Sequence, residues 1–338
     1  MLRTCLAIGA LSLSWLAAVG EGQVSRPRST PAAISEQINS LSSTDPAARA
    51  LAACYLGGMG GRASAAVPSL VRLLSDATPT DTVACRGDAF WAMGFNGPTK
   101  SSPGMEAARA LGFIGEASLE PLLQAVVQNN PAVRRHAAHA LTFIRGERSL
   151  TALLTLAKDP DALVRAEGAT GLGRHGDRRG FDPLVALSRD AAGEVRQAAT
   201  RALGQLRQGD VVKVLLERAK DSDERVRWEA VTALGNGRRD DEGVDVVTTL
   251  IGALGDQSPW VRERAAHVLG RFRDERAVQP LVALLKDSDP DVREEAVTAL
   301  GRFAETQATD SLIAALKDPD AGVRERAARA LSRNRNRQ

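Results

Sequence analysis

A nine-residue pattern, Val-Arg-x-x-Ala-x-x-Ala-Leu, recurs in tandem and constrains the fold more than any other feature of the sequence. Its clear copies begin at Val133, Val164, Val195, Val226, Val261, Val292 and Val323. The closing leucines are separated by 31, 31, 31, 35, 31 and 31 residues. A fixed period of this length indicates a supersecondary unit that stacks on copies of itself, because one unit cannot bury its apolar face alone. The four extra residues of the long interval lie in the turn-forming stretch 236–243, which predicts a lengthened loop.

Each unit is predicted to be a helical hairpin. Within a copy the apolar residues, such as Val226, Ala230, Ala233 and Leu234, fall at i, i+4, i+7 and i+8 and so share one face of a helix, the B helix. Upstream of each copy a second helical pattern, as in 277–287, predicts an A helix. The turns between them are rich in Asp and Pro, which cap and start helices.

A glycine follows most of the closing leucines, and we expect it to end the B helix by adopting a left-handed conformation. The positions are Gly173, Gly204, Gly235, Gly270 and Gly301.

Weaker copies extend the array toward the N-terminus, so that nine hairpins are predicted over residues 33–332. Their A helices are expected to begin near Ala33, Ala66, Ser118, Ser149, Gly180, Val211, Val246, Ala277 and Ala308. The fold class is therefore all-α: an α-solenoid that winds as a right-handed superhelix. The stretch 77–103 interrupts the second hairpin between its two helices, and its cluster of Phe90, Trp91, Met93 and Phe95 predicts a docked lid.

The extended pattern Asp-Pro-x-x-x-Val-Arg-x-x-Ala-x-x-Ala-Leu-Gly resembles the short HEAT-like repeats of the phycobilisome-lyase type. The resemblance covers nearly the whole array. It implies that the B helices line a concave surface and that the array binds proteins, as such arrays commonly do, while the fold itself does not name a ligand.

The two ends of the chain differ from the array. Residues 1–20 have a basic residue, Arg3, an apolar run and small residues at its end, which together predict a cleaved secretory signal peptide and an exported protein, periplasmic or extracellular. An uncleaved membrane anchor is the alternative, although the run is short for a membrane span. Residues 21–32 are interpreted as a linker and 333–338 as a basic, frayed tail.

The charge pattern excludes an obvious nucleic-acid groove. The net charge is +3, aromatic residues are only 4%, and each basic stretch has acidic residues beside it. No nucleophile elbow, phosphate loop or His-Glu dyad appears, and His136 and His139 lack the further ligands of a metal site. We therefore predict no cofactor, no metal and no catalytic residues.

The arginine of the repeat pattern is interpreted as structural. Because it recurs unchanged, it suits the stacking of units better than an anion-binding ladder, and an aspartate six residues before it suits pairing across the turn and between neighbouring repeats. The arginines are Arg134, Arg165, Arg196, Arg227, Arg262, Arg293 and Arg324.

Ligand binding is expected at the positions that vary between copies, two, three and six residues after the motif valine. The candidates are Arg135, His139, Arg201, Trp228, Arg264 and His267, together with Trp91 of the insert. Trp228 is the leading anchor, since Trp and Arg are enriched at interface hot spots, although a Trp folded onto its neighbours is an open alternative. Trp260 is interpreted as a packing cover in a turn.

Two cysteines, Cys54 and Cys85, follow the predicted signal peptide. We predict a disulfide that fastens the insert to the first hairpin, with two unpaired thiols as the alternative.

The leading function is a non-catalytic scaffold that binds a protein or peptide through its concave face and the insert. A lyase-like or chaperone role toward a bilin protein and a carbohydrate or small-ligand receptor are the alternatives. The identity of the partner and the oligomeric state do not follow from the sequence.

Overall fold

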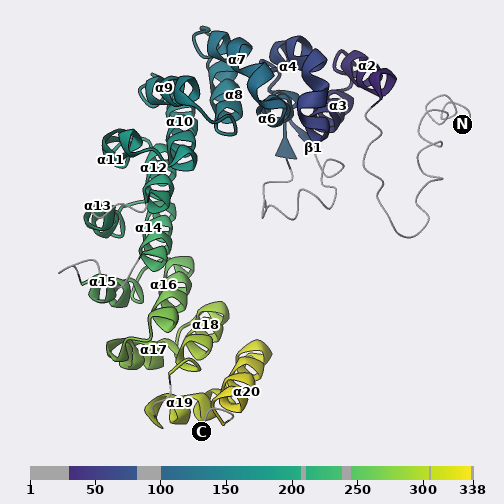
Figure 1. Ribbon diagram of the computed structural model, residues 1–338. Helices are drawn as coiled ribbons and strands as arrows, with labels where there is room; N and C mark the ends of the chain where they lie inside the picture. The colour runs from purple at the N-terminus through teal and green to yellow at the C-terminus, as the bar shows by residue number, and fades with distance from the viewer. Residues whose placement is uncertain (1–29, 82–99, 207–210, 238–244, 304–305, 336–338) are drawn as a thin grey trace, which may run out of the picture.

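The computed structural model describes residues 30–81, 100–206, 211–237, 245–303 and 306–335, and forms one curved α-solenoid (Figure 1). The predicted signal peptide and most of the linker lie outside these residues. Within the described part, each predicted repeat is a pair of antiparallel helices, and nine such hairpins follow one another. The predicted all-α solenoid is confirmed.

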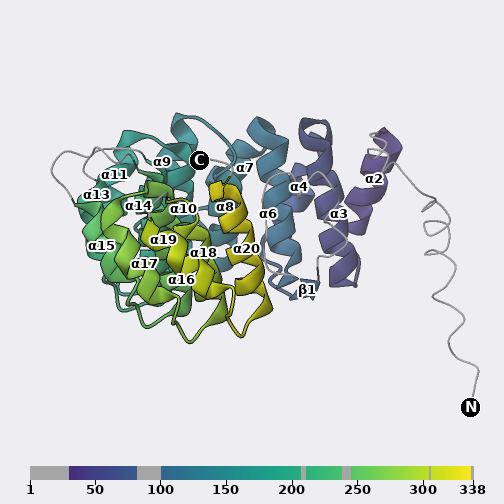
Figure 2. The same cartoon turned by 90° about the horizontal axis from the view of Figure 1, so that it is seen from below.

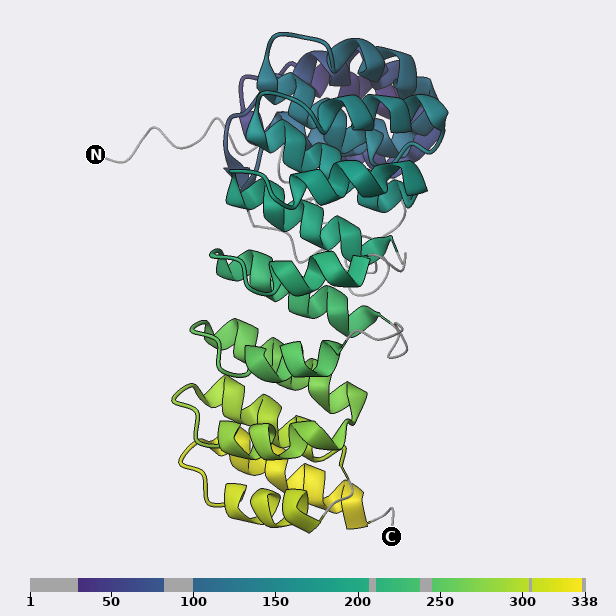
Figure 3. The same ribbon diagram turned by 90° about the vertical axis from the view of Figure 1, so that its left-hand side faces the viewer.

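The A helices lie on the outer side of the arc and the B helices on its inner, concave side (Figure 1). The A helices are α2 (Pro31–Ser40), α4 (Val67–Leu73), α7 (Leu119–Ala125), α9 (Glu147–Leu156), α11 (Phe181–Leu187), α13 (Val211–Arg218), α15 (Val246–Ala253), α17 (Val278–Leu284) and α19 (Thr306–Ala315). The B helices are α3 (Pro46–Met59), α6 (Pro103–Ile114), α8 (Pro131–Leu141), α10 (Ala162–His175), α12 (Gly193–Gln205), α14 (Glu224–Asn236), α16 (Pro259–Phe272), α18 (Pro290–Leu300) and α20 (Ala321–Arg335). Figures 2 and 3 show the same stack from two other directions.

Short 3₁₀ turns lead into several A helices: η1 (Gly60–Ala66), η3 (Gly115–Ser118), η4 (Arg178–Gly180) and η5 (Glu275–Ala277). Helix α20 continues to Arg335, three residues into the stretch interpreted as a tail. In the part of the chain that the structure describes, no helix has both the length and the apolar character that crossing a membrane requires.

The turns start the B helices as their residue types predict. Asp161 accepts hydrogen bonds from the backbone N–H groups of Leu163 and Val164, and Asp289 caps α18 in the same way. Proline occupies the first turn of α18, where no hydrogen-bond donor is lost. Side chain and backbone therefore agree on where the second helix of each hairpin begins.

The apolar core runs through the array between the A and B helices. The repeated leucines and alanines are buried, as for Val226, Ala230 and Leu234, which are at most 2% exposed. The B helices of neighbouring hairpins contact one another directly, so that most core residues of a hairpin are covered by the next one.

None of the five glycines that follow the closing leucines is left-handed, so that expectation is wrong. Four of them lie inside their B helices, and Gly301 caps α18 in a right-handed conformation. Gly173 lies inside α10, whose left-handed cap is Gly176, and Gly270 lies inside α16, whose left-handed cap is Arg273. These glycines instead allow neighbouring B helices to approach closely. A Cβ atom on Gly204 would lie 2.5 Å from the Cβ of Ala233, closer than real Cβ atoms come. The same holds at the other copies, with Ala202 beside Gly173, Val268 beside Gly235, Ala299 beside Gly270 and Ala330 beside Gly301.

A ladder of ion pairs joins successive hairpins along the inter-helix turns. In each rung the motif arginine of one hairpin binds the turn aspartate of the next. The rungs are Arg49 with Asp76, Arg134 with Asp159, Arg165 with Asp190, Arg196 with Asp221, Arg227 with Asp256, Arg262 with Asp287 and Arg293 with Asp318.

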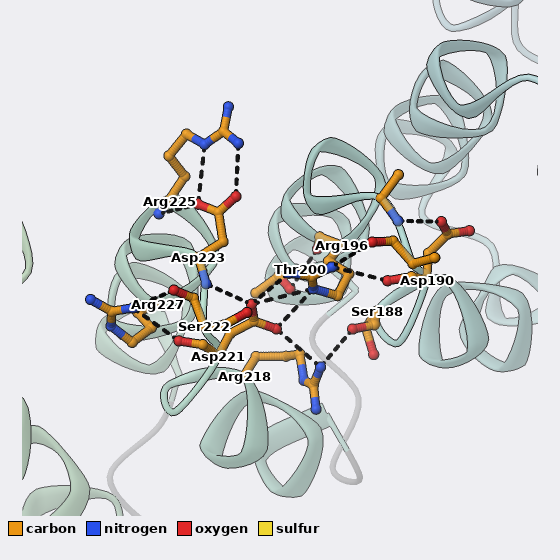
Figure 4. A network of polar contacts seen from close by, with 12 residues as sticks. Ser188, Asp190, Arg196, Thr200, Arg218, Asp221, Ser222, Asp223, Arg225 and Arg227 are labelled. Atoms are coloured by element: carbon orange, nitrogen blue, oxygen red, sulfur yellow. Dashed lines mark hydrogen bonds and ion pairs between the residues drawn. The ribbon is translucent and has the colours of Figure 1, made fainter.

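One rung shows the common geometry (Figure 4). The Nε and Nη2 atoms of Arg196 donate to the carboxylate of Asp221, at 2.9 to 3.3 Å. Its Nη1 atom donates to the backbone carbonyls of Asp190 and Ala191 at 3.1 Å. The aspartate six residues before the arginine thus contributes its carbonyl across the turn, while its carboxylate serves the preceding hairpin. Among the described residues, Arg324 of the final hairpin has only the contacts to carbonyls, those of Asp318 and Pro319.

The ladder has one missing rung, between α6 and α8. Counting back from the closing Leu111, Gly104 stands where the other copies have arginine, and Gln128 stands where they have aspartate. The imidazole of His136 lies against Gly104 and is 2.7 Å from the carbonyl oxygen of Leu74, at the end of α4. A neutral hydrogen bond therefore replaces the ion pair at this joint.

The ends of the insert leave the second hairpin as a short ribbon. Strand β1 (Thr80–Asp81) pairs antiparallel with β2 (Lys100–Ser101), and β1 contacts α3. Trp91, Cys85 and the apolar cluster of the predicted lid lie outside the described residues. The Cys54–Cys85 disulfide stays a prediction.

Candidate functional site

A groove of about 580 Å³ opens on the concave side, between α12, α14 and α16. Its lining residues come from three consecutive B helices and from the turn before α16. They are Gln197, Arg201, Glu224, Arg225, Trp228, Glu229, Ser258, Trp260, Glu263, Arg264 and His267. Because the helices stack in register, equivalent positions of neighbouring B helices lie side by side. The varying residues of successive copies therefore form one continuous surface.

Trp228 lines the groove from α14 and is half-buried. Its ring packs against the apolar core, and the guanidinium carbon of Arg264 lies 5.4 Å from the ring centroid. The Nε atom of Arg264 also donates to the Thr232 hydroxyl at 2.8 Å. Trp228 is thus both a packing residue and a wall of the groove, and Arg264 holds its indole from one side by a cation–π contact.

The interpretation of Trp260 as a packing cover in a turn is wrong. Trp260 lies in the first turn of α16, and 67% of its surface is exposed. An indole this exposed leaves a large apolar area in water on the rim of the groove. Trp260 directly precedes a motif valine, and this position is the second residue of the B helix in all seven clear copies.

The basic side chains of the groove are bound to acidic or polar neighbours. Arg201 donates from Nε to Glu229 at 2.8 Å, and the Glu229 side chain is only 4% exposed. Arg225 pairs with Asp223 at 2.7 Å. His267 contacts Glu295 of the next B helix at 3.0 Å between Nδ1 and Oε1. The positive charges that face this groove are therefore largely neutralised within the protein.

Two carboxylates of the groove have no such neighbour. Among the described residues, neither Glu224 nor Glu263 has a hydrogen bond or ion pair from its side chain. Burial raises the pKa of Glu263, and the negative charges of Glu295, Asp291 and Asp289 raise it further. The positive charge of Arg264 only partly offsets these effects on Glu263. The rim near the start of α16 therefore combines an exposed indole with a half-buried carboxylate that has no direct ion pair among the described residues.

The remaining candidates lie elsewhere on the concave face or outside the described residues. Arg135 and His139 both reach Glu167 of α10, at 3.8 and 3.2 Å. Burial opposes the ionisation of Glu167, but the hydrogen bond from His139 and the nearby positive charges hold its pKa below the ordinary value. The structure thus brings Arg201, Trp228, Arg264 and His267 into one groove and places Arg135 and His139 outside it.

The varying positions follow a second rule that links neighbouring repeats. In four of the six pairs of adjacent clear copies, the residue six positions after one motif valine contacts the residue three positions after the next. These contacts are His139 with Glu167, Arg201 with Glu229, Thr232 with Arg264 and His267 with Glu295. These positions were predicted to face a ligand, but three of the four contacts pair a basic with an acidic residue, and this complementarity in the sequence indicates pairing between adjacent copies.

No group of three or more His, Cys, Asp or Glu side chains that could hold a metal ion occurs among the residues the structure describes. The arrangement of the groove, with two indoles and fixed charges, suits binding.

Comparison with known proteins agrees with this architecture. The family described as HEAT repeats matches residues 105–173, 151–235, 212–289 and 278–338. The YibA protein of Escherichia coli is similar in structure at 20% identity and a TM-score of 0.56, over 79% of this chain and 92% of that one. Importin beta is similar at 15% identity and a TM-score of 0.54, over 89% of this chain and 45% of that one.

Comparison with curated protein sequences gives no match. At these identities the two structures show the fold alone, whereas the matched repeats span most of the chain. The chain therefore belongs to the HEAT-repeat proteins, whose solenoids are typical protein-interaction scaffolds.

Proposed function

We propose that the chain is a non-catalytic scaffold that docks an extended segment of a protein partner in the groove between α12, α14 and α16. The observation that carries the proposal is the pair of indoles, Trp228 and Trp260, on neighbouring B helices of the concave face. One is anchored against the core and the other is 67% exposed. Buried aromatic anchors with a polar rim are the usual centre of a protein interface.

The size of the groove supports a peptide segment as the occupant. A volume of about 580 Å³ holds a few side chains, and the groove is open to the concave surface along the stack. The concave face continues past the groove in both directions (Figure 1), so a longer partner has more surface to contact. The 77–103 insert is proposed as a second contact, as the sequence predicted.

The experiment is selection of a displayed library of random peptides on the purified chain, followed by affinity measurement by isothermal titration calorimetry, which does not depend on the tryptophans that the variants remove. Replacing Trp228 or Trp260 with Ala should lower the affinity of the selected peptides about 30-fold, which corresponds to a loss of about 2 kcal/mol of binding free energy, as expected for a hot-spot residue. Leu163→Ala is the matched control, because Leu163 occupies in α10 the position of Trp260 in α16 and is also exposed.

Selected peptides that bind both tryptophan variants as well as the parent chain would refute the proposed groove. Circular dichroism of each variant separates loss of binding from loss of fold. Tryptophan-dependent binding of free sugars, with no peptide selected, would favour the small-ligand receptor instead.

A further inference from the structure

The acidic and basic side chains at the rim of the groove differ in how they are paired within the protein. Arg201, Arg225 and His267 each contact an acidic side chain of the protein. Glu224 and Glu263 also line the groove, and among the described residues neither has a direct ion pair, although nearby arginines attract both at longer range. Glu224 is exposed, whereas Glu263 is half-buried. A half-buried carboxylate without a counter-charge is unfavourable, and a cation brought to it gains more than one brought to an exposed carboxylate.

The groove already contains one example of the contact that such a cation would make. Arg264 lies over the ring of Trp228 and fills that side of the indole. Trp260, on the same helix as Arg264, has no arginine or lysine over its ring among the described residues. Glu263 follows Trp260 by three residues, so both side chains project from the same face of α16.

We infer that the docked segment presents an arginine or lysine whose cationic head lies on the Trp260 indole, within reach of the carboxylates of Glu263 and Glu224. The ring supplies a cation–π surface, and the carboxylates supply hydrogen-bond acceptors and the opposite charge. Arginine suits the site better than lysine, because its planar guanidinium stacks on the ring and donates in two directions. This inference rests on the proposed function and names the chemistry of its partner.

The test uses the same displayed random-peptide library on four chains: the parent, Glu263→Gln, Glu325→Gln and Trp260→Ala. Glu325 is the matched control, because it holds in α20 the position of Glu263 in α16 but is paired with Arg329. Peptides selected on the parent are expected to be enriched in Arg or Lys. Each is then resynthesised with that residue replaced by Gln, and the affinities are compared.

Glu263→Gln should weaken the basic peptides about tenfold, and the loss should be absent for their Gln-substituted forms and for Glu325→Gln. Selected peptides without a basic residue, or basic peptides that bind Glu263→Gln as tightly as the parent, would overturn the inference. If those peptides still lose affinity for Trp228→Ala or Trp260→Ala, the proposed function stands. Peptides indifferent to Trp260→Ala alone would also overturn the inference, and peptides indifferent to both tryptophan variants would remove the proposed function itself.

Discussion

A methyl group added at Gly204 would enter the space that Ala233 of the next B helix already fills. The new Cβ would lie 2.5 Å from that of Ala233 and 3.3 Å from its Cα atom. Overpacking of this kind typically costs about 1–3 kcal/mol. Replacing a helical glycine with alanine returns up to about 1 kcal/mol of helix propensity, so Gly204→Ala should lower the free energy of unfolding by about 1–2 kcal/mol.

The matched control is Gly58→Ala, because Gly58 is also helical but has nothing within 4 Å of its would-be Cβ atom. This variant should be neutral or more stable. The compensating change is Ala233→Gly, which removes the methyl group that Gly204→Ala would meet. In a double-mutant cycle measured by urea denaturation, the pair should be more stable than the sum of the single changes predicts. The close-packing argument fails if Gly204→Ala and Gly58→Ala shift the midpoint in the same direction, or if the cycle shows no coupling.

Three further predictions concern the ladder, the buried histidine and the core. Asp221→Ala should lower the free energy of unfolding by about 3 kcal/mol, because it removes the buried partner of Arg196. Glu217→Ala breaks an exposed pair and should cost at most about 1 kcal/mol in the same urea titration. Burial opposes the ionisation of Asp221, but hydrogen bonds from Arg196 and the backbone hold its pKa below the ordinary value. Its contribution to stability is therefore present above about pH 4 and is lost as the pH falls further. Asp221→Ala should make the loss of stability below about pH 4 less steep. Burial lowers the pKa of His136, so stability should also fall as the pH drops below about 6.5. His136→Gln should reduce this dependence of the melting temperature on pH, measured by thermal melts at a series of pH values. Leu234→Ala should cost about 2–5 kcal/mol, and an unchanged denaturation midpoint would contradict its place in the core.

The hairpins could be predicted from the sequence because several signals agree in every copy. The 31-residue period, the apolar face of the B helix and the Asp-Pro turns each indicate the same unit, and a unit that repeats leaves one way to bury its apolar face. The position of the insert between α4 and α6 followed from the interruption of that period.

Other features could not be assigned because one residue type serves two purposes. Glycine after the closing leucine suits a left-handed cap and also a close helix contact, and only the packing of Gly204 on Ala233 distinguishes them. In the same way, Arg196 has an aspartate at similar reach in its own turn and in the next, and stacking decides in favour of Asp221.

The groove was predicted in part. Trp228, Arg201 and Arg264 share a face because they occupy varying positions of neighbouring B helices, and the repeat alone places them near one another. Trp260 was assigned to the turn because the pattern begins at Val261, whereas α16 begins two residues earlier, at Pro259. The pairing of His139 with Glu167 and of Arg201 with Glu229 joins varying positions of two copies, so the pattern of a single copy does not reveal it.

The absent ion pair between α6 and α8 gives the solenoid an uneven mechanical character. Pulling on the two ends loads every joint equally, and each joint from α8 onward is fastened by an arginine–aspartate clasp in addition to its apolar contacts. The joint at Gly104 is fastened instead by the imidazole of His136 on a carbonyl oxygen. We therefore expect a stretched molecule to extend first at this joint, so that the first two hairpins, which the Arg49–Asp76 pair joins, move as one block relative to the other seven.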